Sequence, residues 1–359
     1  MPRDQVVEGD LVAVTEIAAI AAAHTMGFGD RQRSERVAVE AIRRTLDETR
    51  LSGRIVVCGG QSLELADTSG GEDSGDDPPG AVELDSEPHG ESSAGGQAML
   101  PAGTRVGALA SSEDVEAIDV AVYPLEGAKL CASGAPGAVS VLATAERGGL
   151  LHAPDTYMEK IIVGPTARGA VQLDAPVPEN LRNIARAFRR EVTDLAVMVL
   201  DRPRHRRLIG DIREAGARIR LIPDGDLAAS IATAVRGTGV HAVMGVGGST
   251  EGVIAAAALR CLGGEIQSRL RAFDDAQAKR LAELGFNDLD TIYSTEDLAR
   301  GSDIAVSCTG VTDGELLRGV RFFGGGVRTS TLSMTLESRQ IRFVDTVRRE
   351  EASSPIRLR

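Results

Sequence analysis

The sequence predicts an α/β protein in which helices cover the faces of a sheet. From residue 118 onward, short apolar runs typical of strands alternate with segments of helical periodicity, which is the pattern of a sheet covered by helices. The chain has 359 residues, of which 42% are hydrophobic, so it can build one large or two medium domains. The sequence shows no repeat of roughly 20–50 residues, so a solenoid is not expected.

The first 63 residues are expected to contribute two helices and one strand. Apolar residues at positions 11, 14, 18 and 21, and again at 38, 41, 42 and 46, recur at helical spacing. The glycine-rich segment Met26–Asp30 separates the two helices, and Arg54–Cys58 has the composition of a short buried strand. We expect residues 1–63 to form the N-terminal part of the fold.

Residues 64–104 differ in composition from the rest of the chain. They contain ten Asp or Glu and no Lys or Arg, and Gly, Ser and Pro fill most other positions. Such a segment cannot bury enough apolar area to offset its ordering entropy. We therefore expect a disordered acidic insertion at 64–104, although an acidic run can also bind metal or serve as a partner tail.

The remainder of the fold is expected at 105–350, followed by a flexible tail at 351–359. Strands are predicted at 118–122, 138–145, 160–163, 195–200, 218–222 and 242–246, and helices at 178–190, 204–215, 227–235 and 251–262. A final group of strands is predicted at 304–307, 328–334 and 339–344.

Composition excludes several classes of partner. The net charge of −12 argues against nucleic acid or an anionic membrane, and no run of about 18 apolar residues could span a bilayer. Ten of the negative charges lie in the acidic insertion, so the rest of the chain is close to neutral.

The four cysteines are far apart and lie in or beside apolar runs, which favours buried thiols over disulfides or a zinc site. Because Met1–Asp10 also lacks the apolar core of a signal peptide, we expect a cytoplasmic location.

Charged residues follow four of the predicted strands. Glu126 lies in a turn after a strand that starts near Asp119, where a carboxylate could bind a hard divalent cation or belong to an ordinary solvated turn. Arg202 and Arg204 flank Pro203 at the start of a helix. They are suited to phosphate, and an exposed basic helix end is the alternative.

Two further turns complete this pattern. Asp224 and Asp226 follow the next strand and could accept sugar hydroxyls or cap a helix. A glycine loop then leads through Gly248 to Glu251, where the carboxylate favours a cation or sugar over a dinucleotide. Since ligands bind at the carboxyl ends of strands, we expect these turns to share one site. The five histidines form no cluster with ligand spacing.

Together these residues resemble the class II fructose-1,6-bisphosphatases of the lithium-sensitive sugar-phosphatase superfamily. The resemblance runs from about residue 8 to 348, interrupted by the acidic insertion. It is carried by VTEIAA (14–19), YMEKIIVGP (157–165), LDRPRH (200–205), PDGD (223–226), GGSTEG (247–252) and TGVTDGELL (309–317).

The resemblance implies a layered α-β-α-β-α fold and hydrolysis of fructose 1,6-bisphosphate to fructose 6-phosphate, as in gluconeogenesis and glycerol metabolism. It also implies Mn²⁺ or Mg²⁺, which clamp the phosphate and activate water while a threonine assists the attack. Metal positions carry over to Glu35, Glu126 and Glu251. Substrate positions carry over to Glu126, Gly127, Tyr157, Arg202, Pro203, Arg204, Asp224, Gly225, Asp226 and Gly248.

The departures from the family pattern concentrate on the chemistry. Gly59 and Tyr123 stand where the family has metal-binding carboxylates. Leu63, Ala128 and Arg31 occupy the family's catalytic Asp, Thr and Lys positions, and a methyl group cannot orient an attacking water as a hydroxyl does. No catalytic position is therefore intact, while the substrate positions are kept.

We therefore expect a homologue that binds a phosphorylated sugar and has an impaired phosphatase activity, with metal binding weakened. One alternative is a working enzyme in which Glu35, Glu126, Glu251 and carboxylates such as Asp119 hold one metal. The other is a non-catalytic sensor or regulatory subunit. We expect a homo-oligomer, or a hetero-oligomer with an active paralogue.

Overall fold

The computed structural model describes residues 3–60, 100–112, 115 and 117–349. Most of the predicted acidic insertion, and all of the predicted tail, lie outside the described residues. The last part of that insertion, residues 100–104, is described and belongs to the fold. Leu100 is fully buried, Ile55 donates a backbone hydrogen bond to Thr104, and Gly103 donates one to Ile55. The fold therefore resumes at residue 100, before the predicted boundary at 105.

Within the described residues, the strands form two sheets. The larger one has the order β11 (Arg321–Phe323), β12 (Gly326–Thr335), β10 (Ala305–Gly310), β4 (Val139–Ala145), β3 (Ile118–Glu126), β1 (Gly53–Cys58) and β2 (Arg105–Val106), and β13 (Gln340–Arg349) also pairs with β12. The smaller one has the order β7 (Arg218–Ile222), β6 (Ala196–Leu200), β8 (Ala242–Gly248), β5 (Tyr157–Val163) and β9 (Glu265–Arg271). Parallel pairing joins β1 to β3, and β6 to both β7 and β8.

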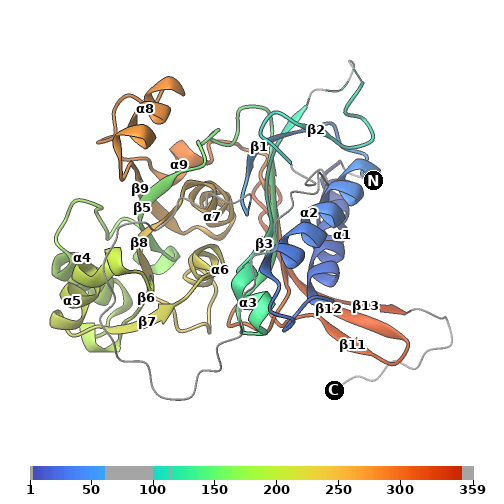
Figure 1. Ribbon diagram of the computed structural model, residues 1–359. Coiled ribbons are helices and arrows are strands. Elements are labelled where there is room, and N and C mark those ends of the chain that lie inside the picture. The colour runs from blue at the N-terminus through green and yellow to red at the C-terminus, as the bar shows by residue number, and fades with distance from the viewer. Residues whose placement is uncertain (1–2, 61–99, 113–114, 116, 350–359) are drawn as a thin grey trace, which may run out of the picture.

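Helices and sheets alternate in five layers, which confirms the predicted α-β-α-β-α fold (Figure 1). The outer helices α1 (Arg3–Ala23) and α2 (Arg31–Glu48) cover the large sheet, and α4 (Val177–Phe188) and α5 (Arg206–Glu214) cover the small one. Between the sheets lie α6 (Asp226–Ala232) and α7 (Ser249–Leu262). The remaining helices are α3 (Ala128–Ser133), α8 (Asp275–Glu283) and α9 (Thr295–Leu298).

The middle layer brings the two sheets together. Helix α7 packs against β3, β4 and β10 on one side and against β5, β8 and β9 on the other. Its central residues, Ala255–Ala258, are essentially fully buried. Because alanine has a small side chain and the highest helix propensity, this segment stays helical while both sheets approach it closely. The loops at the strand ends of both sheets therefore face one another.

Several elements were not predicted, for a common physical reason. Strand β9 alternates buried apolar with partly exposed polar residues, and its charged positions hide the strand pattern. Helix α8 has a largely polar sequence, and α3, β2 and β11 are short. The predicted helices and strands are all found, with ends shifted by a few residues. Among the described residues, no helix is both long and apolar enough to cross a membrane.

Candidate functional site

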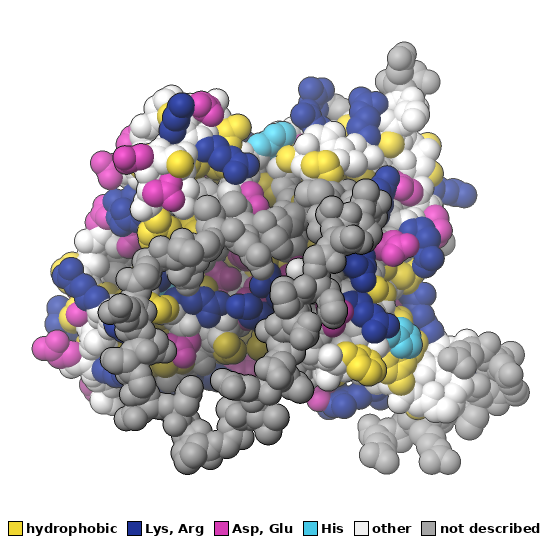
Figure 2. Space-filling model, viewed as in Figure 1, with side chains coloured by type: hydrophobic (Ala, Val, Ile, Leu, Met, Phe, Trp, Pro, Cys, Tyr) yellow, Lys and Arg dark blue, Asp and Glu magenta, His cyan; other side chains and the backbone are white. Residues whose placement is uncertain are grey.

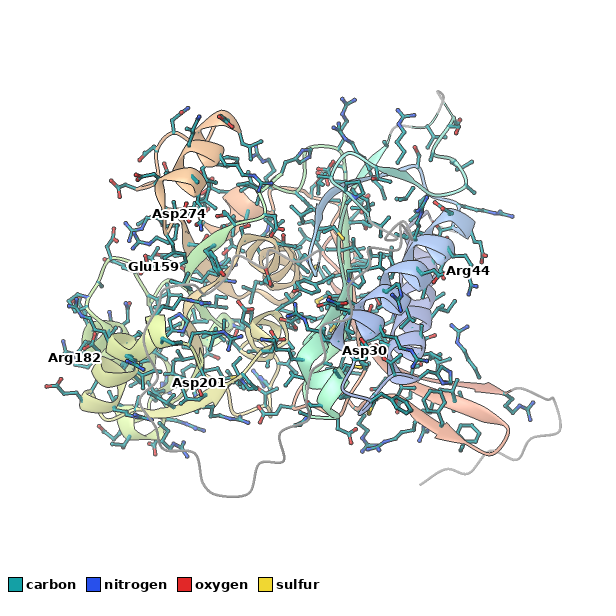
Figure 3. The ribbon with its side chains drawn as sticks, viewed as in Figure 1. Asp30, Arg44, Glu159, Arg182, Asp201 and Asp274 are labelled. Carbon is teal, nitrogen blue, oxygen red and sulfur yellow. The ribbon has the colours of Figure 1, made fainter. Side chains whose placement is uncertain are left out.

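The predicted site residues come together where the loops of the two sheets meet. Tyr123 and Glu126 lie at the end of β3, Arg202–Arg204 follow β6, Asp224–Asp226 follow β7, and Gly248 and Glu251 lie at the junction of β8 and α7. In Figure 3 the labelled Asp201 marks the end of β6, and Asp30 marks the start of α2. The face in Figure 2 carries Lys and Arg side chains interspersed with Asp and Glu.

Glu126 is buried, with 1% of its surface exposed. Its Oε1 accepts a hydrogen bond from the N–H of Leu227 at 2.5 Å, and its Oε2 accepts one from Ala228 at 3.0 Å. These amides belong to the first turn of α6, where a negative charge is favourable. The solvated-turn interpretation is therefore wrong, because this carboxylate of β3 caps a helix of the middle layer. Burial raises the pKa of Glu126 well above its ordinary value, and Asp226 raises it further.

The two aspartates after β7 have different partners. Asp226 Oδ2 accepts a hydrogen bond from the buried ammonium of Lys160 at 2.7 Å, while Asp224 Oδ1 accepts one from the N–H of Gly225 at 3.1 Å. The helix-cap interpretation is wrong for both, because the N-cap of α6 is Gly225 and no side chain of that residue can cap it. Gly225 has a φ of 91°, which only glycine adopts readily. Burial, and then Asp226, raise the pKa of Asp224.

Arg204 is fixed in place by neighbours. Its Nε and Nη2 donate hydrogen bonds to the carbonyl of Val246 at 3.2 and 2.9 Å. Its guanidinium carbon lies 5.1 Å from the centre of the Tyr157 ring, a cation–π arrangement. Tyr157 in turn packs edge-on against Phe273, with 4.9 Å between ring centres. Since Arg204 is half-buried, the alternative of an exposed basic helix end is wrong for this residue.

His205 also holds β8 in place, a role that the sequence analysis did not assign to it. Its Nε2 accepts a hydrogen bond from the N–H of Val246 at 2.8 Å, so the proton resides on Nδ1, which lies 2.7 Å from the carbonyl of Leu200. Burial lowers the pKa of His205. The amide and the carbonyl of Val246 are thus held by two consecutive residues, His205 and Arg204.

Glu251 folds back over the glycine loop. A Cβ atom added at Gly248 would be 2.0 Å from Oε2 of Glu251, so glycine is needed at 248 for this carboxylate to occupy its place. Burial raises the pKa of Glu251 to about 7, and Asp226 also raises it, whereas Lys160 lowers it. Glu251 therefore lies beside the Lys160–Asp226 pair.

Tyr123 lies within this group of carboxylates. Burial raises its pKa well above the ordinary value, and Glu251, Glu126 and the two aspartates after β7 raise it further. A Cβ atom added at Gly59 would be 2.2 Å from ring carbons Cδ2 and Cε2 of Tyr123. Positions 59 and 123, two of those where the resemblance implies metal-binding carboxylates, are thus in direct contact, with the ring of Tyr123 filling the space beside Gly59.

Of the three positions where the resemblance implies catalytic residues, 31 and 128 lie within the described part of the chain. Ala128 is buried at the start of α3, directly after Gly127, whose φ of 78° is left-handed. Arg31 Nε donates a hydrogen bond to Glu35 Oε1 at 2.9 Å, one turn along α2. Glu35 raises the pKa of Arg31 against the opposing effect of burial. Leu63 lies outside the described residues.

The residues present do not fit the metal centre that the resemblance implies. Among the described residues, no group of three or more His, Cys, Asp or Glu side chains is arranged to hold a metal ion. Both oxygens of Glu126 accept backbone hydrogen bonds, and Glu35 forms an ion pair with Arg31. Asp119 lies at the far end of β3, where its Oδ2 accepts a hydrogen bond from Leu150. The expectation that Glu35, Glu126 and Glu251 form a ligand set is therefore not supported by their arrangement.

Lys160 is the main functional residue that the sequence predictions missed. Its side chain is 4% exposed, and its Nζ donates to the carbonyl of Gly248 at 2.9 Å as well as to Asp226. A lysine inside the otherwise apolar second half of β5 is a signal that could have identified it, because lysine is rarely buried without a partner.

The five-layer fold, with basic and acidic side chains gathered at its strand ends, defines the chain as a layered α/β protein of the sugar-phosphatase type. The family model described as bacterial fructose-1,6-bisphosphatase, glpX-encoded, matches residues 5–348. A protein named D-fructose 1,6-bisphosphatase class 2/sedoheptulose 1,7-bisphosphatase from Synechococcus sp. (strain JA-3-3Ab) is 43% identical, with 96% of each chain covered. A protein of the same name from Synechocystis sp. (strain ATCC 27184 / PCC 6803 / Kazusa) is 40% identical, with 97% of this chain and 98% of the relative covered. The chain belongs to the class II fructose-1,6-bisphosphatase family.

Proposed function

We propose that the chain binds a phosphorylated sugar at this site and that its hydrolysis of fructose 1,6-bisphosphate is impaired. One observation carries the proposal. Internal contacts hold Arg204 in place, on the side of the site where the resemblance implies sugar-phosphate contacts. On the side where it implies metal ligands, the ring of Tyr123 lies against Gly59.

The part of the site around Arg202, Arg204 and Asp224 has suitable chemistry for binding a phosphate ester. Arg204 is held between Val246 and the Tyr157 ring, so little side-chain entropy is lost when it binds an anion. Arg202 lies close enough to Asp224 to lower the pKa of that carboxyl. A carboxylate beside an arginine can accept sugar hydroxyls while the arginine contacts the phosphate.

The part of the site around Tyr123 and Ala128 lacks the groups that activate water. Ala128 offers a methyl group where an attacking water would need a hydroxyl. The phenol of the half-buried Tyr123 has a raised pKa and stays protonated near neutral pH, so it cannot act as a general base there. We therefore expect a rate of phosphate release far below that of an intact member of the family.

The remaining parts of the proposal concern the cellular setting. The four cysteines, all within the described part of the chain, form no disulfide with one another, which supports a cytoplasmic location. The relatives' names suggest fructose 1,6-bisphosphate and sedoheptulose 1,7-bisphosphate as the first ligands to test. A regulatory subunit paired with an active paralogue is the second candidate function. The ring of Tyr123, which lies where metal ligands would be expected, favours this function over slow catalysis.

Two measurements on the purified protein test the proposal. Calorimetry should detect binding of fructose 1,6-bisphosphate, and a phosphate-release assay with Mn²⁺ should show little turnover. Arg204→Met should abolish binding, while Arg207→Met, which changes an exposed arginine in α5, serves as the matched control. Robust turnover would contradict the impairment. Absence of binding would mean that the retained arginines and aspartates are structural remnants.

If the impairment arises from the residues named above, their replacement should relieve it. Tyr123→Asp together with Ala128→Thr restores the family's residues at two altered positions. We expect this variant to release more phosphate than the wild type when Mn²⁺ is present. An unchanged rate would place the cause elsewhere, for example at Gly59.

A further inference from the structure

We propose that this site binds its phosphorylated sugar without a divalent cation, because the ring of Tyr123, seated on Gly59, fills the cation's place and protein groups balance the surrounding carboxylates. This inference rests on the proposed function for its ligand. It explains the altered positions 59 and 123 as one matched change rather than two separate losses.

The first step of the argument is steric. A Cβ atom at Gly59 would lie 2.2 Å from two carbons of the Tyr123 ring, far inside van der Waals contact. At Gly60, where φ is 78°, a Cβ atom would lie 3.4 Å from Cε1 of the same ring. The ring therefore covers both glycines. A glutamate at 59 and a tyrosine at 123 exclude each other in this backbone, so the ring can be present only because position 59 has no side chain.

The second step concerns the ring's surroundings. Glu126, Glu251, Asp224 and Asp226 all lie near enough to act electrostatically on the Tyr123 phenol. These are carboxylates of the kind that would surround a hard cation. A neutral phenol carries one O–H donor and no charge, so it can sit among carboxylates without adding to their repulsion.

The third step is charge balance. A divalent cation would normally neutralise such a cluster, and here three protein groups do so. The ammonium of Lys160 bonds to Asp226 at 2.7 Å. The guanidinium of Arg31 bonds to Glu35 at 2.9 Å. The backbone amides of Leu227 and Ala228, in the first turn of α6, donate hydrogen bonds to Glu126. Asp226, Glu35 and Glu126 are thus already committed to internal partners.

The consequence is a binding site in which arginines can supply the positive charge that a phosphate needs. Arg204 is oriented by the backbone carbonyl of Val246 and by the ring of Tyr157. A phosphate can therefore be recognised by guanidinium groups, as in many metal-independent phosphate sites.

The first test measures fructose 1,6-bisphosphate binding by calorimetry, once with EDTA and once with Mn²⁺. We expect dissociation constants that agree within about twofold, because the sugar site needs no cation. An affinity at least about tenfold higher with Mn²⁺ would overturn the inference while leaving the proposed function intact. If no sugar binds in either condition, the proposed function fails and the second test alone decides the question of the cation.

The second test measures Mn²⁺ binding directly, by electron paramagnetic resonance without sugar. The wild type should bind Mn²⁺ at this site at least about tenfold more weakly than the Gly59→Glu/Tyr123→Asp double variant, which exchanges both residues together. Equal Mn²⁺ affinity of the two proteins would overturn the inference.

A mutant cycle then tests whether positions 59 and 123 act as a unit. Gly59→Glu alone should lower the melting temperature more than the double variant does, because the new side chain meets the ring only in the single variant. Gly210→Glu is the matched control, since nothing lies within 4 Å of the Cβ position there. If Gly59→Glu does not fold, Gly59→Ala with and without Tyr123→Asp gives the same comparison. Additive effects would show that the ring does not depend on Gly59.

Discussion

Lys160 Nζ donates a hydrogen bond to Asp226 Oδ2 at 2.7 Å, which joins β5 of the small sheet to the first residue of α6. The same ammonium group also holds the carbonyl of Gly248 at 2.9 Å. A single buried cation therefore links the loop after β7 to the glycine loop after β8.

Replacing this cation should destabilise the protein strongly. Lys160→Met leaves the Asp226 charge buried without its partner, which costs about 3–5 kcal/mol of unfolding free energy. The control is Arg168→Met, which breaks the exposed pair with Glu296, whose side chains are 50% and 51% exposed, and should cost less than about 1 kcal/mol. Urea unfolding measures both values. Equal losses would show that the Lys160–Asp226 pair is not a buried charge pair in solution.

Removing the carboxylate that caps α6 should also reduce stability. Glu126→Ala leaves the amides of Leu227 and Ala228 without their acceptor in a buried place, at a cost of about 2 kcal/mol or more. Asp274→Ala removes the exposed N-cap of α8, where Oδ1 accepts from Gln277 at 2.7 Å, and should cost about 1 kcal/mol. Thermal unfolding of the two variants checks this order, and the reverse order would contradict the burial of the Glu126 contact.

Two buried histidines should make stability fall in acid. Burial lowers the pKa of both His205 and His241, and Nδ1 of His241 accepts a hydrogen bond from Ala196 at 3.0 Å. Below about pH 6.5 the unfolded chain then binds more protons than the folded chain. The stabilising contribution of the two neutral histidines to the free energy of unfolding is therefore complete above that pH and is lost as the pH falls. Each proton is worth up to about 1.4 kcal/mol per pH unit.

The comparison that isolates this contribution uses the double variant His205→Asn/His241→Asn. The raised pKa of Glu251, about 7, acts in the opposite direction, since its contribution is present at low pH and lost as the pH rises through 7. The difference in unfolding free energy between wild type and variant removes this shared effect. Between pH 7.5 and 5.5 that difference should shrink, and a constant difference would be evidence against neutral buried histidines.

The thiols should resist modification while the protein is folded. Burial raises the pKa of Cys261 to about 12 and that of Cys308 even higher, so the reactive thiolate is scarce. Burial also raises the pKa of Cys131. Iodoacetamide followed by mass spectrometry should label these three cysteines only after denaturant is added. Rapid labelling of Cys308 in native buffer would mean that β10 opens readily.

Much of the fold follows from periodic burial, which is a local property of the sequence. The stripe that includes Leu11 and Val14 in α1 and the apolar run of β6 each face a core, so their patterns are regular. Strand β9 has one face against α7 and one partly exposed face with Glu265 and Arg269. Its charges hide the strand, because no local pattern shows which face a neighbouring helix will cover.

The site was predictable as a set of positions but not as a set of contacts. The turns carrying Glu126, Arg204 and Asp226 follow strands, and their chemistry was apparent from the sequence. Their partners were not, because Leu227 lies 101 residues from Glu126 and Lys160 lies 66 residues from Asp226. The solvated-turn interpretation of Glu126 and the helix-cap interpretation of Asp226 failed for this reason, since distant partners replaced the local ones that spacing suggested.

The two hydrogen bonds from α6 to Glu126 have a consequence for how genomes are annotated. Because this glutamate anchors an interlayer helix to the large sheet, natural selection for a folded chain would keep it even after all turnover had ceased. Its presence in a homologue is therefore no sign of an active enzyme. The pair at 59 and 123 is more informative, because the ring of Tyr123 fits only against a residue without a side chain and leaves no carboxylate at either position.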